Sequence, residues 1–136
     1  MKQNPLLTIS SLLSLLFFTF HVTDDIVRGF EKGGLQDLNA VLIWVVWLYG
    51  TLVLAGRRSG YIIIILGSIL VSGIPVLHAR GAGLAGGRLA NTSGLFFWVW
   101  TLLALGVTGL FSLVLSVHGL WNLRRSKSRE SADANT

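Results

Sequence analysis

The chain has 136 residues, of which 52% are apolar and only 12% are charged, and its mean hydropathy is +0.68. These values lie outside the range of soluble domains and indicate an integral membrane protein. The absence of cysteine excludes disulfides, thiolate metal ligands and thiol redox chemistry. The net charge of +5 does not indicate nucleic acid as a partner, because the basic residues lie in short loops and a tail, as membrane orientation requires.

Four apolar segments follow one another along the chain, and none of them contains Lys, Arg, Asp or Glu. They cover residues 6–22, 38–55, 61–79 and 95–121. A helix needs about 20 apolar residues to cross the hydrocarbon core of a bilayer. The sequence therefore predicts an all-α integral membrane protein, in which residues 1–123 form one domain, an antiparallel bundle of four transmembrane helices.

The first segment follows Pro5, a residue that suits the first turn of a helix. In residues 23–32 the apolar and polar side chains fall on opposite sides of a helical wheel. We therefore expect an amphipathic extension of the helix that lies at the membrane interface. Within it, Asp24 and Arg28 are spaced for an i, i+4 ion pair.

One group of polar residues near the end of the first segment has the composition of a metal site. His21, Asp24 and Asp25 share a helical face, and His78 ends the third segment on the same side of the membrane. Two imidazoles with carboxylates suit Zn²⁺ or Mn²⁺, and two imidazoles can hold a haem iron. The sequence does not require a cofactor. A zinc, manganese or haem site is therefore an alternative to the interpretation of these polar residues as the polar face of an interfacial helix. One ion can join the two histidines only if their side chains lie within about 8 Å, given ligand bonds of ~2 Å.

The second and third segments are joined by Gly56-Arg57-Arg58-Ser59-Gly60. This short turn predicts an antiparallel hairpin. Near the far end of the third segment, Pro75 is expected to kink the helix.

A glycine-rich loop, residues 80–88, precedes the fourth segment. It contains G-x-G-x-x-G, but no strand precedes it and no βαβ unit surrounds it, so dinucleotide binding is not expected. Arg80 and Arg88 at its two ends are candidate contacts for a lipid headgroup or another anionic ligand.

The fourth segment carries a small residue at every fourth position of one face. These residues are Ala104, Thr108, Ser112 and Ser116. Small side chains allow close helix contact in lipid, so we expect this face to pack against another helix. The third segment offers its own small residues as partners, namely Gly67, Ser68, Ser72 and Gly73.

Three aromatic residues near segment ends, Tyr61, Trp98 and Trp121, are expected in an interfacial belt.

The last residues of the chain, 124–136, are polar, basic and without periodicity. They predict a disordered cytoplasmic tail that is attracted to anionic lipid.

The distribution of Lys and Arg predicts the orientation of the bundle. Seven of these residues flank one side, namely Lys2, Arg57, Arg58, Arg124, Arg125, Lys127 and Arg129. Four flank the other, namely Arg28, Lys32, Arg80 and Arg88. The positive-inside rule therefore predicts that both termini are cytoplasmic, and we expect the protein in the plasma (inner) membrane. The histidines then face outward.

Three functional hypotheses follow. The first is a non-catalytic membrane protein that binds lipid, a small apolar ligand, another membrane protein or a second copy of itself. The second is a small oligomeric transporter or channel. In length and span count the chain is similar to the small multidrug-resistance transporters, but those depend on an acidic residue inside the first span, and residues 6–22 have none. The third is an outward-facing metal- or haem-binding protein. No catalytic triad is visible, so we do not expect an enzyme.

Overall fold

The computed structural model describes residues 4–31, 33–34, 38–80 and 94–133. Within these ranges the chain forms four helices and no strand. The helices are α1 (Pro5–Val27), α2 (Leu38–Leu52), α3 (Arg58–Arg80) and α4 (Leu95–Asp133). This confirms the all-helical fold that the sequence predicted.

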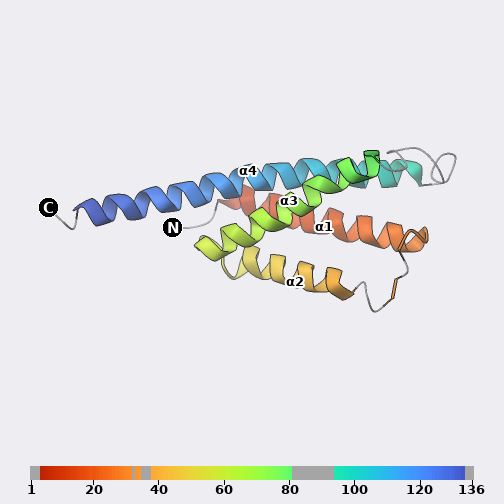
Figure 1. Cartoon of the computed structure of the whole chain (residues 1–136), viewed down its shortest axis with the longest axis horizontal. Helices are drawn as coiled ribbons and strands as arrows, with labels where there is room; N and C mark the ends of the chain where they lie inside the picture. Colours follow the sequence, from red (N-terminus) through yellow and green to blue (C-terminus); the bar gives the residue numbers. More distant parts are fainter. Residues whose placement is uncertain (1–3, 32, 35–37, 81–93, 134–136) are drawn as a thin grey trace.

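Successive helices run in opposite directions, so that α1 and α3 point one way and α2 and α4 the other (Figure 1). The start of α1 and the end of α4 therefore lie at the same end of the bundle, on the left in Figure 1. We call this the hairpin end, because it also holds the α2–α3 turn. We call the opposite end, where α1 and α3 finish and α4 begins, the histidine end.

Local sequence explains where α1 begins and how the chain turns after α1 and after α2. Asn4 caps α1, since its side-chain oxygen accepts a hydrogen bond of 3.0 Å from the backbone nitrogen of Leu6. Pro5 takes the first helical position, where its missing N–H is not needed. Gly29 follows α1 with a φ of +74°, and Gly56 in the α2–α3 turn has the same value. Both positions favour glycine because a side chain is strained at positive φ.

Three of the helices are long and apolar enough to cross a membrane. These are α1, residues Arg58–His78 of α3 and residues Leu95–Ser126 of α4. The second predicted span, residues 38–55, is shortened, since α2 ends at Leu52. Its 15 residues extend over roughly 22 Å at 1.5 Å per residue, less than a hydrocarbon core of about 30 Å.

The end of the chain differs from the disordered tail that we predicted from Arg124 onward. The helix α4 has 39 residues and continues through Asp133. Residues 124–133 contain neither proline nor glycine, and adding residues to an existing helix avoids the nucleation cost that an isolated segment meets. The polar composition that suggested disorder is therefore compatible with a helix that projects beyond the apolar part of the bundle.

Glycines bring α3 and α4 into close contact along most of their shared length. A Cβ added at Gly106 would lie 2.9 Å from Pro75, and one added at Gly109 would lie 2.7 Å from the hydroxyl oxygen of Ser72. Both separations are too short for ordinary packing, so glycine sets the distance between the two helices.

The small-residue face of α4 packs against α1. The hydroxyl group of Ser112 donates a hydrogen bond of 3.0 Å to Oγ of Ser10, and Ser14 Oγ lies 3.4 Å from Ser112 Oγ. Ser112 and Ser116 are fully buried, whereas Ala104 and Thr108 are partly exposed. The face therefore meets another helix as expected, and the hydroxyl contacts of Ser112 go to α1.

The small residues of α3, which we expected to meet that face, have different neighbours. Gly67 lies against Trp47 of α2, Ser72 lies against Gly109 of α4, and an added Cβ at Gly73 would have no neighbour within 4 Å. Of the α3 residues that we expected to meet α4, Ser72 does so, at Gly109, whereas Gly67 packs against α2.

Candidate metal site

The polar face of the last turns of α1 points into the bundle. His21 is 4% exposed and Asp25 is 8% exposed, whereas Val27 is 79% exposed. An interfacial amphipathic helix would turn its polar face to water, so our interpretation of residues 23–32 was wrong in direction and in extent, because α1 ends at Val27. Val27, on the apolar side, is directed outward, where lipid can cover it.

His21 and Asp25 lie one helical turn apart and contact each other. Nε2 of His21 is 3.4 Å from Oδ2 of Asp25. The spacing i, i+4 places the two side chains above one another on α1, and burial against the other helices keeps them together. The backbone of α1 thus positions two of the potential ligand atoms without help from a loop.

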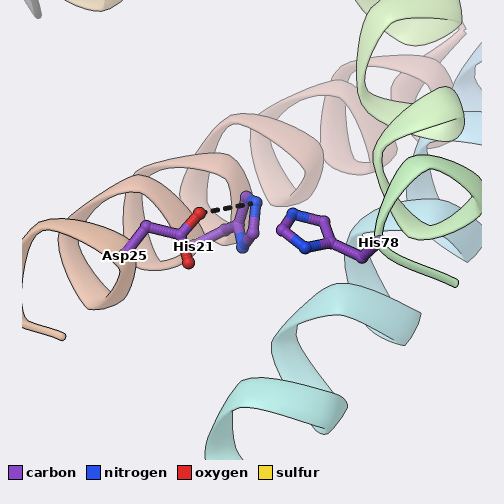
Figure 2. Close-up of side chains that lie close together, drawn as sticks. All are labelled: His21, Asp25 and His78. Atoms are coloured by element: carbon purple, nitrogen blue, oxygen red, sulfur yellow. Dashed lines mark ion pairs between the residues drawn. The ribbon is translucent and has the colours of Figure 1, made fainter. Parts of the chain in front are cut away.

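His78 reaches the same point from the last turn of α3. Its ring centroid lies 5.0 Å from that of His21, and the two rings are nearly perpendicular, at 87°. One ligand atom from each of His21, Asp25 and His78 can be chosen so that all three lie within 4.8 Å of one another. Figure 2 shows the three side chains pointing toward one another from the two helices. The histidines therefore meet the 8 Å condition for sharing one ion.

Trp98 of α4 closes the cluster on a third side. Its indole nitrogen donates a hydrogen bond of 3.2 Å to Oδ1 of Asp25. Its ring also meets His78 edge to face, with centroids 5.2 Å apart. Sequence reasoning missed this role, because a tryptophan near the start of a membrane helix is usually assigned to the interfacial belt. The available signal was the position of Trp98 along the bundle. Because α1 and α4 are antiparallel, the first turn of α4 lies beside the last turn of α1.

Asp24, the fourth candidate residue, is turned away from the cluster. Its Oδ2 accepts a hydrogen bond of 2.7 Å from Nε of Arg28, in the i, i+4 pair that the sequence predicted. Nη2 of Arg28 also donates to the carbonyl oxygen of Gly94, at 3.1 Å. This second bond ties the end of α1 to the start of α4. Asp24 and Arg28 therefore support the site from outside rather than forming part of it.

The chemistry of the cluster is that of a borderline-soft cation site. Two imidazoles and one carboxylate are ligands that Zn²⁺ commonly uses. The Nδ1 atom of His21 is buried and has no hydrogen-bond partner within the described part of the chain, so this imidazole is not fully used by the protein itself. Among the residues that the structure describes, His21, Asp25 and His78 are the group whose ligand atoms converge in this way.

The remaining candidate residues lie elsewhere. Arg80 is exposed at the end of α3, at the histidine end. Arg88 and the rest of the glycine-rich loop fall in residues 81–93, outside the described residues. The third histidine, His118, is exposed on α4 toward the hairpin end, with Nε2 3.4 Å from Nδ2 of Asn122. It cannot contribute to the cluster.

Comparison with known protein families, with curated proteins and with solved structures finds no match for this chain.

Proposed function

We propose that the chain crosses the membrane four times, with both termini in the cytoplasm and the histidine end outside. Three helices have the length and composition of spans. Since α1 and α3 run in the same direction (Figure 1), a chain that crosses with both must return between them. Residues 28–57, which include α2, make that return. The excess of Lys and Arg at the hairpin end supports the cytoplasmic assignment.

We propose further that this membrane protein binds a zinc ion through His21, Asp25 and His78. The observation that carries the proposal is the 3.4 Å separation between Nε2 of His21 and Oδ2 of Asp25. Two ligand atoms at 2.0–2.1 Å from a tetrahedral zinc lie about 3.4 Å apart, so these two atoms already have the spacing of a shared ion. One ligand atom from each of the three residues can be chosen so that all three lie within 4.8 Å of one another, and a shift on the order of 1 Å brings His78 to the spacing of a shared ion.

The geometry favours a single ion over a haem. A haem iron with two axial histidines needs a porphyrin plane between the imidazoles. Here the rings of His21 and His78 meet edge to face at 5.0 Å, and Trp98 packs against His78 from the third helix. Such direct ring contact leaves no plane for a porphyrin.

The proposed role is metal binding without catalysis by the protein. A catalytic zinc site needs a further acid or base that is free to exchange protons with substrate. The nearby carboxylate of Asp24 is paired with Arg28 at 2.7 Å. An ion held by α1 and α3 would join the ends of two helices, and the protein would act as a membrane-embedded zinc carrier or sensor.

The proposal is tested by zinc binding to the purified protein in detergent micelles. The protein is equilibrated with excess Zn²⁺, the free ion is removed, and the zinc content is measured by elemental mass spectrometry. We expect one zinc ion per chain. The substitutions His21→Ala, Asp25→Asn and His78→Ala should each reduce the affinity at least tenfold, because each removes one of three protein ligands.

Two matched variants serve as controls. His118→Ala removes the histidine at the other end of the bundle, and Asp24→Asn removes the adjacent carboxylate that pairs with Arg28. Both should retain stoichiometric zinc. A wild-type protein that binds no zinc, or a His118→Ala variant as weak as His78→Ala, would rule out the proposed site.

A further inference from the structure

The two carboxylate oxygens of Asp25 have different partners. Oδ2 faces Nε2 of His21 at 3.4 Å. Oδ1 accepts the 3.2 Å hydrogen bond from the indole nitrogen of Trp98. One oxygen is thus directed at the proposed ion and the other is held by α4.

We infer that Trp98 restricts Asp25 to binding through one oxygen and thereby makes the site selective for Zn²⁺ over Mn²⁺. This inference rests on the proposed zinc site and names the residue that determines its selectivity. Trp98 is a positioning residue, because it acts on the ion through Asp25.

The selectivity follows from coordination number. Zinc is stable with four ligands in tetrahedral geometry, and the site offers two imidazole nitrogens, one carboxylate oxygen and one open position. Manganese prefers about six ligands, mainly oxygen, and gains from a carboxylate that binds through both oxygens. Binding through both oxygens would compete with Trp98 for Oδ1, and loss of that hydrogen bond would leave the indole N–H buried without an acceptor. That cost applies to manganese and not to zinc.

Trp98 is itself held firmly enough to act in this way. It is only 1% exposed, and its backbone N–H is bonded to the carbonyl oxygen of Gly94 at 3.0 Å. That same carbonyl oxygen accepts the bond from Arg28, so the first turn of α4 is fixed to the end of α1. The indole ring is also perpendicular to the ring of His78, with centroids 5.2 Å apart. Trp98 therefore touches two of the three ligands, one on α1 and one on α3.

The test compares Trp98→Phe with Trp100→Phe. Phenylalanine at position 98 keeps an aromatic ring but removes the N–H, while Trp100 is 55% exposed on the same helix and serves as the matched control. We expect Trp98→Phe to lower the ratio of zinc to manganese affinity by about tenfold or more. Cobalt should report the geometry: the intense visible bands of tetrahedral Co²⁺ in the wild type should weaken in Trp98→Phe and remain in Trp100→Phe.

The outcomes separate the two proposals. A wild type that binds no zinc overturns the zinc site itself. A wild type that binds zinc, with a folded Trp98→Phe variant of unchanged selectivity and unchanged cobalt spectrum, overturns the role of Trp98 alone.

If Trp98→Phe does not fold, the wild type provides the measurement. The chain has five tryptophans, which give five indole N–H signals in a protein labelled with ¹⁵N-tryptophan. Substituting Asp25→Asn identifies the Trp98 signal, since the carboxylate of Asp25 accepts the hydrogen bond of this N–H. Zinc should shift this signal while leaving it protected from exchange with water, because the hydrogen bond persists. Rapid exchange of this proton in the zinc-bound protein would show that Asp25 has released Trp98 and would overturn the inference.

Discussion

Trp47 of α2 lies directly on Gly67 of α3: a Cβ added at Gly67 would come within 2.5 Å of Cε3 of the indole. Trp47 is 1% exposed, so it has little room to move. The absence of a side chain at position 67 therefore sets the distance between α2 and α3. The buried residues of the short helix α2 are Trp47, Gly50 and Thr51, so this contact is a main part of its packing.

Substituting Gly67→Ala should destabilise the bundle by about 1–3 kcal/mol, the usual cost of adding a methyl group to a filled core. The matched control is Gly73→Ala on the same helix, where an added Cβ has no neighbour within 4 Å. There alanine should be neutral or stabilising by up to about 1 kcal/mol, because it favours the helix over glycine. Thermal unfolding in detergent measures both. Equal losses at the two positions would show that Trp47 does not pack as described.

The indole nitrogen of Trp47 also joins α2 to α1. It donates a hydrogen bond of 2.8 Å to Oγ of Ser11, and Ser11 Oγ lies 2.8 Å from Oγ1 of Thr51. Ser11→Ala should cost about 1–3 kcal/mol, because it leaves the indole N–H buried without an acceptor. Thr51→Val removes only the second bond and should cost about 0.6 kcal/mol, the average for a hydrogen bond between membrane helices.

Thermal unfolding measures the loss of stability in both variants, and the decisive result is that Ser11→Ala loses more than Thr51→Val. If Thr51→Val cost as much as Ser11→Ala, the hydroxyl pair rather than the indole would carry the stability.

The helices were predictable because apolar runs of sufficient length have one common solution in a membrane. His21 and His78 could also be placed at the same end, since they finish two segments that run in the same direction. The rotation of α1 about its axis could not be predicted. In water the apolar face of a helix identifies its buried side. Lipid, however, is as apolar as the protein interior. The separation of apolar and polar residues on the helical wheel of residues 23–32 therefore did not show which face was buried.

The site was predictable only in part for the same reason. Residue types and spacing brought together His21, Asp25 and His78, but they gave Asp24 equal weight. Which of two adjacent carboxylates points inward depends on the helix rotation. The contribution of Trp98 depends on the register between α1 and α4, which is set by the Ser10, Ser14 and Ser112 contacts rather than by any local pattern.

Zinc should stabilise the folded protein, because an ion that joins α1 to α3 binds the native state and not the unfolded chain. At a free concentration one hundred times the dissociation constant, the expected gain is about 2.7 kcal/mol. Thermal unfolding with and without Zn²⁺ should show this increase in the wild type and in His118→Ala, and no increase in His78→Ala. An equal increase in all three would mean that zinc acts elsewhere on the chain.

The membrane crossing of α2 can be tested with single cysteines, since the natural chain has none. Glu31 and Ser59 are both exposed and lie on either side of α2, near the histidine end and the hairpin end respectively. If α2 crosses with both termini in the cytoplasm, Glu31→Cys should react with an impermeant maleimide in intact cells. Ser59→Cys should react only after the membrane is permeabilised, because Arg57 and Arg58 hold its turn on the cytoplasmic side. The reverse pattern would invert the orientation, and labelling of both from one side would show that α2 does not cross.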